Sequence, residues 1–141
     1  CIDRHLSSRG DKTAILFDER QTLKADITFK IRTTKQEELF LLELENGKDT
    51  KKAVEKCRNH GLAILKGTAN KKYDFKRGYR TLWIFEYESI LQATLKRLQQ
   101  DPFFEKLQEY FLFKPIQKLK GEDFFLDWLN LSGKERKMYY L

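Results

Sequence analysis

The sequence predicts an α/β domain with a mixed central sheet and helices on both faces of that sheet. Ile27, Phe29 and Ile31 alternate with polar residues, which is typical of a strand with one buried face. Residues 81–87 are almost continuously apolar, which indicates a strand covered on both sides. Apolar residues at helical spacing separate the later strands, and this favours helix crossovers between strands of one sheet.

The first half of the chain is expected to contain a hairpin and one helix. Its elements in order are an irregular polar segment (1–13), a short strand (14–17), the alternating strand (26–32), an apolar strand (39–45) and a helix that begins at Asp49 or Thr50 and ends near His60. Two strands joined by a short polar loop most simply pair antiparallel. Gly61 is a good C-terminal stop for the helix.

The second half is expected to alternate strands and helices. Its elements in order are the strand 81–87, a helix capped by Ser89, a further helix starting at Asp101-Pro102, a short strand (111–113), a final amphipathic helix or turn around Phe124, Phe125, Trp128 and Leu129, and an edge strand (138–141). Asp followed by Pro is typical of a helix start, because Asp caps the first turn and Pro is tolerated at the first helical position.

The composition is that of one globular domain, 1–141. Apolar residues make up 40% and charged residues 35% of the 141 residues, and no apolar run is long enough to span a membrane. The two cysteines lack the spacing of a zinc site or a disulfide framework, which favours a reducing cytoplasm. Because the chain begins at Cys1, we expect it to be the C-terminal part of a longer protein.

An anionic partner is expected because the net charge is +7, and DNA is the commonest such partner for a basic domain. The basic segment 66–80 interleaves cationic and aromatic side chains, which can contact phosphates and stack on bases. Its candidate DNA contacts are Lys66, Lys71, Lys72, Tyr73, Lys76, Arg77 and Arg80. The alternative is a solvated loop whose aromatic residues pack into the core.

Three acidic side chains are expected to meet at one end of the hairpin. If the turn is centred between Thr34 and Lys35, Asp26 lies opposite Glu43, with Cβ atoms about 5 Å apart. Glu45 is two residues further along and shares that face. Because opposed like charges destabilise a sheet, this arrangement favours a bound cation, and oxygen ligands suit Mg²⁺ or Mn²⁺. The alternative is a different register, in which one or more of the acids face solvent.

The following helix can bring basic groups to these acids. Ala53, Val54 and Cys57 form its buried stripe, and Lys56 and His60 lie on one flank of that stripe. The helix starts soon after the second strand of the hairpin, so this flank can face the carboxylates. The alternative for Lys56 and His60 is a solvated helix face.

The order of these residues resembles the PD-(D/E)xK nucleases, which share the restriction-endonuclease-like fold. The segments that carry the resemblance are 24–29 (KADITF), 40–50 (FLLELENGKDT) and the helix with Lys56 and His60. Within that group the chain is similar to the replication-relaxation family of plasmids and mobile elements, including a late strand that begins at Arg80. The similarity extends over roughly residues 13–114.

The resemblance implies an endonuclease that depends on Mg²⁺ or Mn²⁺ and hydrolyses a DNA phosphodiester during plasmid replication or mobilisation. By this resemblance Asp26 and Glu43 hold one or two cations, and Glu45 is a further ligand or orients the attacking water. Lys56 would stabilise the transition state. The resemblance also implies a DNA-binding winged-helix part ahead of this domain.

Two positions depart from the family pattern. Ala25 stands where the motif has proline, and Glu45 stands where it has lysine. Lys56 is the first candidate for a lysine that has moved to the helix, and Lys48 is the second.

Two functions without catalysis remain as alternatives. If no lysine reaches the site, the chain would be a catalytically inactive DNA-binding or protein-docking domain of a replication or mobilisation protein. The other alternative is a structural interaction module, in which exposed aromatic residues near Trp128 and Tyr139 bury against a partner. A homodimer is one assembly of that kind.

Overall fold

The computed structural model describes residues 2–6, 14–18, 21–32, 37–67, 79–119, 124 and 126–138. The strands in these ranges are β1 (Ile2–Leu6), β2 (Ala14–Asp18), β3 (Gln21–Lys24), β4 (Ile27–Arg32), β5 (Glu37–Glu45), β6 (Arg80–Phe85), β7 (Phe111–Pro115), β8 (Trp128–Leu129) and β9 (Glu135–Arg136). The α-helices are α1 (Thr50–Lys66) and α3 (Glu88–Gln99), and the short 3-10 helices are η2 (Pro102–Phe104), η3 (Gln108–Tyr110) and η4 (Ile116–Lys118).

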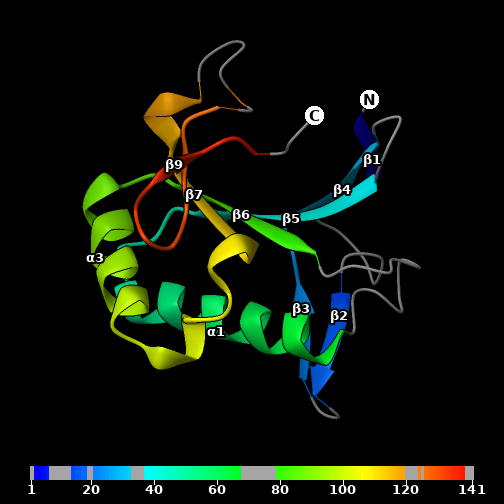
Figure 1. Ribbon diagram of the computed structural model, residues 1–141, viewed down its shortest axis with the longest axis horizontal. Helices are drawn as coiled ribbons and strands as arrows, with labels where there is room; N and C mark the ends of the chain where they lie inside the picture. Colours follow the sequence, from blue (N-terminus) through cyan, green and yellow to red (C-terminus); the bar gives the residue numbers. More distant parts are fainter. Residues whose placement is uncertain are drawn as a thin grey trace.

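The domain is built on a mixed sheet in the order β1-β4-β5-β6-β7-β8-β9, and β2 and β3 form a separate two-stranded hairpin (Figure 1). Strands β5, β6 and β7 are parallel to one another. The strands β1, β4, β8 and β9 pair antiparallel with their neighbours. The predicted α/β class and mixed sheet are therefore confirmed, and the expected hairpin is β4–β5.

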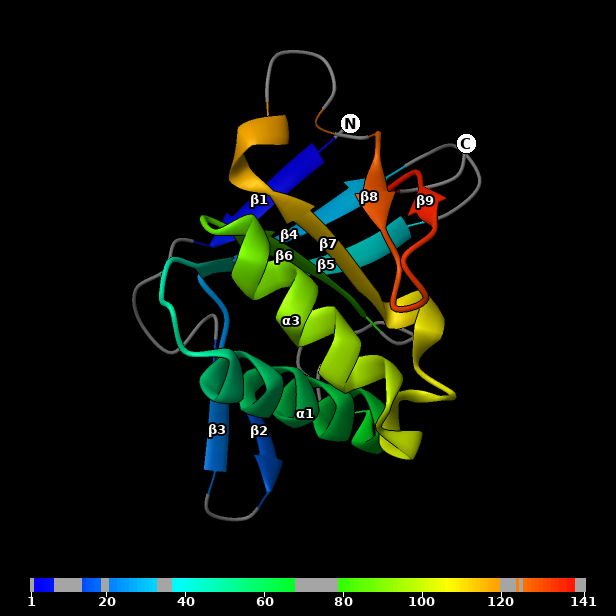
Figure 2. The ribbon, with the colours of Figure 1, turned by 90° about the vertical axis from the view of Figure 1, so that its left-hand side faces the viewer.

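The two α-helices of the described ranges, α1 and α3, lie on one face of the sheet, so within these ranges the prediction of helices on both faces is wrong (Figures 1 and 2). The crossovers β5–α1–β6 and β6–α3–β7 each step one strand in the same direction across the sheet. Because such crossovers are almost always right-handed, consecutive steps in one direction place their helices on the same side. The chain that follows β7 covers the opposite face.

The two faces of the central strands enter separate cores. The helix-side core includes Leu39, Leu41, Ala53, Cys57, Trp83, Phe85, Leu91, Leu95, Phe111 and Phe113. The opposite core includes Phe29, Ile31, Phe40, Leu42, Leu82, Ile84, Leu112, Trp128 and Met138. Because both of its faces are covered, the middle of β5 is continuously apolar rather than alternating.

Helix α1 is longer than the sequence predicts, because Gly61 does not end it. The Asp49 side chain caps its N-terminus by accepting a hydrogen bond of 3.2 Å from the Lys52 backbone N–H, and Gly67, with φ of 66°, caps its C-terminus. A Cβ on Gly61 would lie 2.7 Å from Phe103 Cε2 and 3.0 Å from Leu107 Cδ1. Gly61 therefore permits the close approach of α1 to η2 and the residues after it.

Three further elements differ from the sequence predictions. Residues 2–6 form β1, paired antiparallel with β4, where an irregular segment is predicted. Tyr87 occupies the N-cap position of α3, so Ser89 lies inside the helix and does not cap it. The helix expected from Asp101 onward is only the three-residue η2, although Asp101 caps it as predicted.

The C-terminal segment forms the two-residue strands β8 and β9, where an amphipathic helix or a turn is predicted around Phe124 to Leu129. Trp128 is fully buried, so it is not an exposed aromatic residue that a partner could cover. Phe125 and Tyr139 lie outside the described residues, as does most of the edge strand predicted for 138–141.

A buried lysine holds this segment to the sheet. The Lys114 ammonium donates hydrogen bonds to the carbonyl oxygens of Phe124 at 3.3 Å and Leu126 at 2.6 Å. It also lies 5.0 Å from the centre of the Trp128 ring. Burial of a cation is costly without such acceptors, so these contacts are what permit a lysine in the sheet interior.

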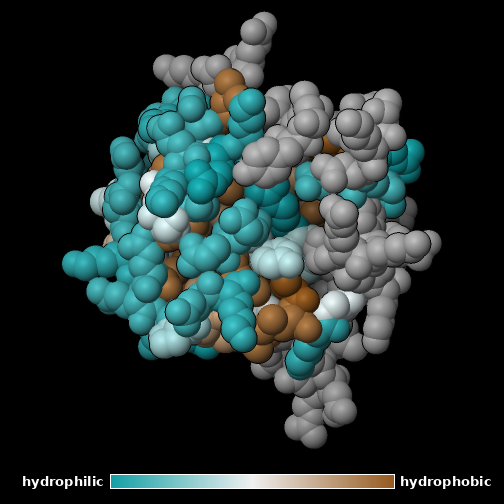
Figure 3. Space-filling model, in the orientation of Figure 1, coloured by the Kyte–Doolittle hydropathy of each residue, from teal (hydrophilic) through white to brown (hydrophobic). Residues whose placement is uncertain are grey.

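The surface of the face shown in Figure 3 is largely hydrophilic, as the charged composition suggests. Within the described ranges the large apolar side chains that remain exposed are Leu44, Leu65, Ile116 and Leu126. No helix in those ranges combines the length and the apolar character that crossing a membrane requires.

Replacing Gly61 with alanine should destabilise the domain, although alanine is the better helix former by about 1 kcal/mol. The added methyl group would overlap the Phe103 ring, and overpacking of this kind costs about 1–3 kcal/mol. Urea unfolding of Gly61→Ala should therefore show a net loss of up to about 2 kcal/mol.

The loss should be smaller when Gly61→Ala is introduced into a Phe103→Leu background, where the ring is absent. Gly47→Ala is the matched control, because the nearest atom to its Cβ would be 4.0 Å away. A loss at Gly47 as large as that at Gly61 would contradict the packing explanation.

Candidate active site

The register of the β4–β5 hairpin is the one predicted from its polar loop. Ile27 pairs with Leu42, so the next position of the ladder places Asp26 opposite Glu43. Asp26 lies in a bend just before β4, partly buried, and its Oδ2 accepts a hydrogen bond from the Leu44 backbone N–H at 2.8 Å. This bond ties Asp26 to the end of β5 beside Glu43.

Glu43 and Glu45 face the helix layer, because side chains alternate along a strand and Leu39 and Leu41 of β5 already face it. Both acids are buried, with 5% and 8% of their surfaces exposed. Burial of a carboxylate among apolar side chains is unfavourable unless it is hydrogen-bonded. Helix α1 supplies a partner for each of them.

Lys56 of α1 is the partner of Glu45, with its Nζ 2.8 Å from Glu45 Oε1. The lysine side chain is half-exposed, whereas that of Glu45 is almost completely buried. Burial lowers the pKa of Lys56, but the hydrogen bond to Glu45 and the charges of Glu45, Glu43 and Asp26 outweigh this effect, so the pKa is raised. Lys56 is therefore charged at neutral pH and within electrostatic reach of all three acids.

His60, one turn further along α1, is the partner of Glu43. Its Nε2 is 3.1 Å from Glu43 Oε1, and its Nδ1 is 3.1 Å from the hydroxyl of Tyr79. All three side chains are buried. Burial raises the pKa of Glu43, the His60 hydrogen bond offsets this only in part, and the nearby charge of Asp26 raises the pKa further.

Each carboxylate is held through one oxygen: Asp26 Oδ2, Glu43 Oε1 and Glu45 Oε1. Within the described residues the second oxygen of each carboxylate accepts no hydrogen bond. These second oxygens are also not among the buried side-chain atoms that lack a hydrogen-bond partner. The second oxygens therefore reach solvent. An oriented carboxylate with one open oxygen suits a hard cation, which takes oxygen ligands.

The donor set fits a site with few protein ligands. In the described ranges no group of three or more His, Cys, Asp and Glu side chains could hold a metal ion. Mg²⁺ is often bound by only one or two carboxylates, with water and phosphate completing its shell. The predicted set of three ligands is therefore not formed in the described ranges, and Asp26 and Glu43, which lie opposite each other at the end of the hairpin, are the two acids that could share a cation.

Lys48, the second candidate for the displaced lysine, lies elsewhere. Its Nζ is 5.2 Å from the centre of the Tyr87 ring. Lys48 follows β5 and Tyr87 follows β6, so this contact joins the segments after the two strands. The Glu86 backbone N–H also donates a hydrogen bond of 2.9 Å to the Glu45 carbonyl oxygen there. Of the two predicted lysines, the described contacts bring Lys56 to the carboxylates.

Most of the basic segment predicted to bind DNA lies outside the described residues, namely Lys71, Lys72, Tyr73, Lys76 and Arg77. Lys66 is exposed at the end of α1. The Arg80 guanidinium donates to the carbonyl oxygens of Glu109 at 3.0 Å and Met138 at 2.6 Å. Arg80 therefore connects β6 to the C-terminal segment, and its predicted contact with DNA stays a prediction.

Tyr79 and Trp83 line the inner wall of the site, and neither is predicted from the sequence to belong to it. Trp83 pairs with Glu43 in the β5–β6 ladder, and its ring meets the His60 ring edge-on with centroids 5.3 Å apart. The indole is fixed by a hydrogen bond of 2.8 Å from Nε1 to Thr81 Oγ1. Knowledge of the β5–β6 register would have identified Trp83, but a long crossover leaves that register open in the sequence.

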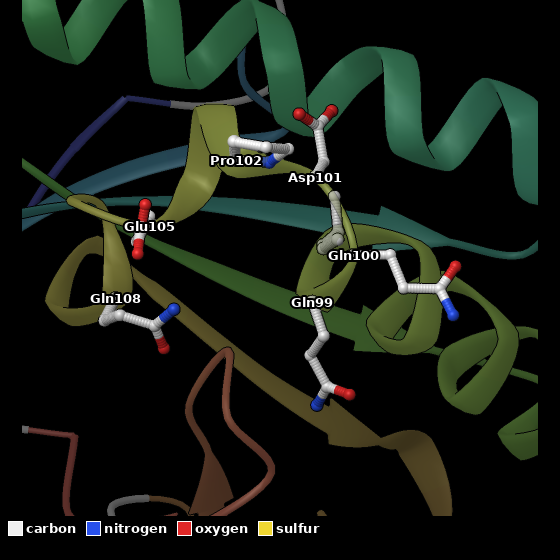
Figure 4. Close-up of a pocket in the computed structure, with 7 residues that line it drawn as sticks. Gln99, Gln100, Asp101, Pro102, Glu105 and Gln108 are labelled. Carbon is white, nitrogen blue, oxygen red and sulfur yellow. The ribbon is translucent and has the colours of Figure 1, made fainter.

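A separate hollow of about 230 Å³ lies at the C-terminal end of α3 (Figure 4). It is lined by Leu98, Gln99, Gln100, Asp101, Pro102, Glu105 and Gln108, none of which belongs to the carboxylate site. Gln99 donates to the Leu131 carbonyl at 2.9 Å, and Asp101 pairs with Arg58 of α1. These two polar groups of the hollow therefore connect neighbouring elements.

Comparison with known proteins identifies no relative of this chain. No family model, no curated protein and no solved structure matches it. The assignment of a function therefore depends on the residues of the site itself.

The raised pKa of Glu43 should make the stability of the domain depend on pH. Because this pKa is raised above the ordinary value of 4.5, the folded state favours the protonated acid. Protonated Glu43 therefore contributes stability that is fully present below the pKa of this residue in the unfolded state. This contribution is lost as the pH rises through the pKa of Glu43 in the folded state. Glu43→Gln, which cannot ionise, should therefore be more stable than the wild type at pH 8, and the difference should shrink toward pH 4.

Urea unfolding of both proteins across this pH range measures the effect. Glu55→Gln, at an exposed position of α1, is the control and should change stability little at any pH. If Glu43→Gln became less stable relative to the wild type as the pH rose, the explanation by burial would be wrong.

Proposed function

We propose that this domain is a metal-dependent endonuclease that hydrolyses DNA, of the restriction-endonuclease-like type, in a replication or mobilisation protein of a plasmid or mobile element. The observation that carries the proposal is the position of Asp26 opposite Glu43, with charged Lys56 beside them on the next helix. Two acids that can share a cation, with a cationic group next to them, can support phosphodiester hydrolysis.

Asp26 and Glu43 would hold the divalent cation, Mg²⁺ or Mn²⁺. Each is fixed through one oxygen and can present the other without rearrangement. The charge of Asp26 raises the pKa of Glu43, and a cation between them would relieve this repulsion. When bound, such a cation lowers the pKa of a water molecule and offsets the charge of the scissile phosphate.

Lys56 would stabilise the negative charge that develops on the phosphate in the transition state. Its raised pKa keeps the ammonium protonated, and half of its side chain is exposed to an approaching substrate. Glu45 would hold the ammonium in place until the substrate binds. A Glu–Lys pair would thus replace the single lysine of the family motif.

DNA is the substrate that the charge of the chain favours, because the net charge is +7. The basic segment 66–80 leads from the end of α1 into β6, which pairs with β5 at Glu43. Lysine and arginine contacts to phosphate do not read the base sequence, so we expect binding without strong sequence preference.

The nuclease proposal predicts DNA cleavage that requires Mg²⁺ or Mn²⁺ and stops when a chelator is added. Asp26→Asn and Glu43→Gln should each lower the single-turnover cleavage rate by at least about 100-fold, because each removes a ligand. Lys56→Met should lower it by about 100- to 1,000-fold through loss of charge stabilisation.

Glu55→Gln and Lys52→Met, at exposed positions of the same helix, are the controls and should keep the wild-type rate. Unchanged cleavage by Asp26→Asn, Glu43→Gln and Lys56→Met would rule out the proposal, since the activity would then come from elsewhere.

A catalytically inactive DNA-binding or protein-docking domain is the second candidate. The observation that favours it is that the acids already have partners within the protein, Glu43 with His60 and Glu45 with Lys56. Such pairing allows the buried charges to be stable without a cation, so the same residues could persist without catalysis.

This second candidate predicts DNA binding that depends on salt but not on divalent cations. Lys71→Ala combined with Lys72→Ala should weaken binding and reduce the slope of log K against log salt concentration by about 2. Fluorescence anisotropy with labelled duplex and single-stranded DNA measures both. Lys96→Ala combined with Lys106→Ala, at exposed positions of the α3 side, is the control. Lack of binding at low salt would contradict both candidates.

A further inference from the structure

We propose that His60, oriented by Tyr79, is a positioning residue that holds the Glu43 carboxylate in the orientation in which it can share a divalent cation with Asp26. The inference rests on the proposed function and adds to it two residues outside the carboxylate set. It assigns a role to the buried His60 imidazole and Tyr79 hydroxyl, two polar groups that the packing of the core does not require.

The His60 ring is held by both of its nitrogens and by two aromatic neighbours. Nε2 is 3.1 Å from Glu43 Oε1, and Nδ1 is 3.1 Å from the Tyr79 hydroxyl. The rings of Tyr79 and Trp83 meet the imidazole edge-on, with centroids 5.9 Å and 5.3 Å away. Only 1% of the His60 surface is exposed, so water cannot readily replace these partners.

Tyr79 restricts the imidazole from the side opposite Glu43. Its hydroxyl lies 3.1 Å from Nδ1 and 3.3 Å from the backbone carbonyl oxygen of His60. When Nε2–H donates to Glu43, Nδ1 is the acceptor for the single hydroxyl proton. Two contacts from one hydroxyl to one residue limit both the rotation of the ring and the position of this turn of α1. Tyr79 directly precedes β6, so the three side chains connect β6, α1 and β5.

Packing alone gives no reason for a phenol, an imidazole and an acid at this place. The surrounding helix-side core is apolar and aromatic, and polar groups cost more to bury there than apolar groups of similar size. A satisfied buried network does, however, fix one geometry. Here it occupies Glu43 Oε1 and leaves the other oxygen of that carboxylate for a cation beside Asp26.

Metal-binding side chains are commonly oriented by a hydrogen bond from a further residue, and loss of that residue weakens metal binding about 10- to 100-fold. His60 makes the orienting hydrogen bond to Glu43, whereas Lys56 makes the corresponding bond to Glu45. We therefore expect His60 to affect the affinity for the cation and not the affinity for DNA in the absence of metal.

The test measures Mn²⁺ binding to the DNA-free protein by calorimetry and metal-free DNA binding by anisotropy. His60→Leu removes the donor, so it should weaken Mn²⁺ binding about 10- to 100-fold and leave DNA affinity within about twofold. His60→Gln, whose amide can still donate to Glu43, should recover much of the Mn²⁺ affinity. Tyr79→Phe should weaken Mn²⁺ binding by a smaller factor, about 3- to 10-fold, because it acts only through the ring.

Cys57→Ala, at a fully buried position of the same helix, is the matched control and should leave Mn²⁺ affinity unchanged. Wild-type Mn²⁺ affinity in His60→Leu would overturn the inference and leave the proposed function standing. Equal losses of Mn²⁺ and DNA affinity in both His60 variants would also overturn it, because they indicate a general structural role. A wild-type protein that binds no Mn²⁺ would instead overturn the proposed function, and the inference with it.

Discussion

The register of β4 against β5 is the constraint on which the candidate site depends. Side chains alternate along a strand, so a slip of one residue would turn Glu43 and Glu45 away from α1. Two separate cores oppose such a slip, because Leu39 and Leu41 of β5 belong to one core and Phe40 and Leu42 to the other. The hydrogen bond from Leu44 N–H to Asp26 then closes the end of the hairpin where the acids meet.

The polar groups of the site form a gradient from the interior to the surface. Tyr79 and His60 are almost inaccessible, Glu43 and Glu45 are slightly more open, and the Lys56 side chain is half-exposed. Natural proteins tolerate stability-lowering groups of this kind where function needs them. Hydrogen bonds at both nitrogens of His60 hold the buried end of the gradient. The exposed end, at Lys56, is where a substrate would arrive if the proposed function holds.

Short-range features could be predicted from the sequence, and long-range ones could not. The centre of a polar loop was sufficient for the hairpin register, and the four-residue spacing of Lys56 and His60 placed both on one face of α1. The arrangement of both helices on one side depends on strand order, which no local pattern contains. Gly61 suggests a helix end when taken alone, because the ring that explains it, Phe103, lies far along the chain. The place of Tyr79 in the site could not be predicted for the same reason, because its partner His60 lies on another element of the fold.

The buried ammonium of Lys114 makes the C-terminal segment an integral layer of the domain. Its acceptors, the carbonyls of Phe124 and Leu126, belong to the chain that covers the side of the sheet opposite α1 and α3 with Trp128 and Met138. A chain truncated before Phe124 would open this apolar side to water and deprive the ammonium of two acceptors, which favours aggregation over folding. The apolar layer on this side of the sheet therefore includes the chain as far as Met138.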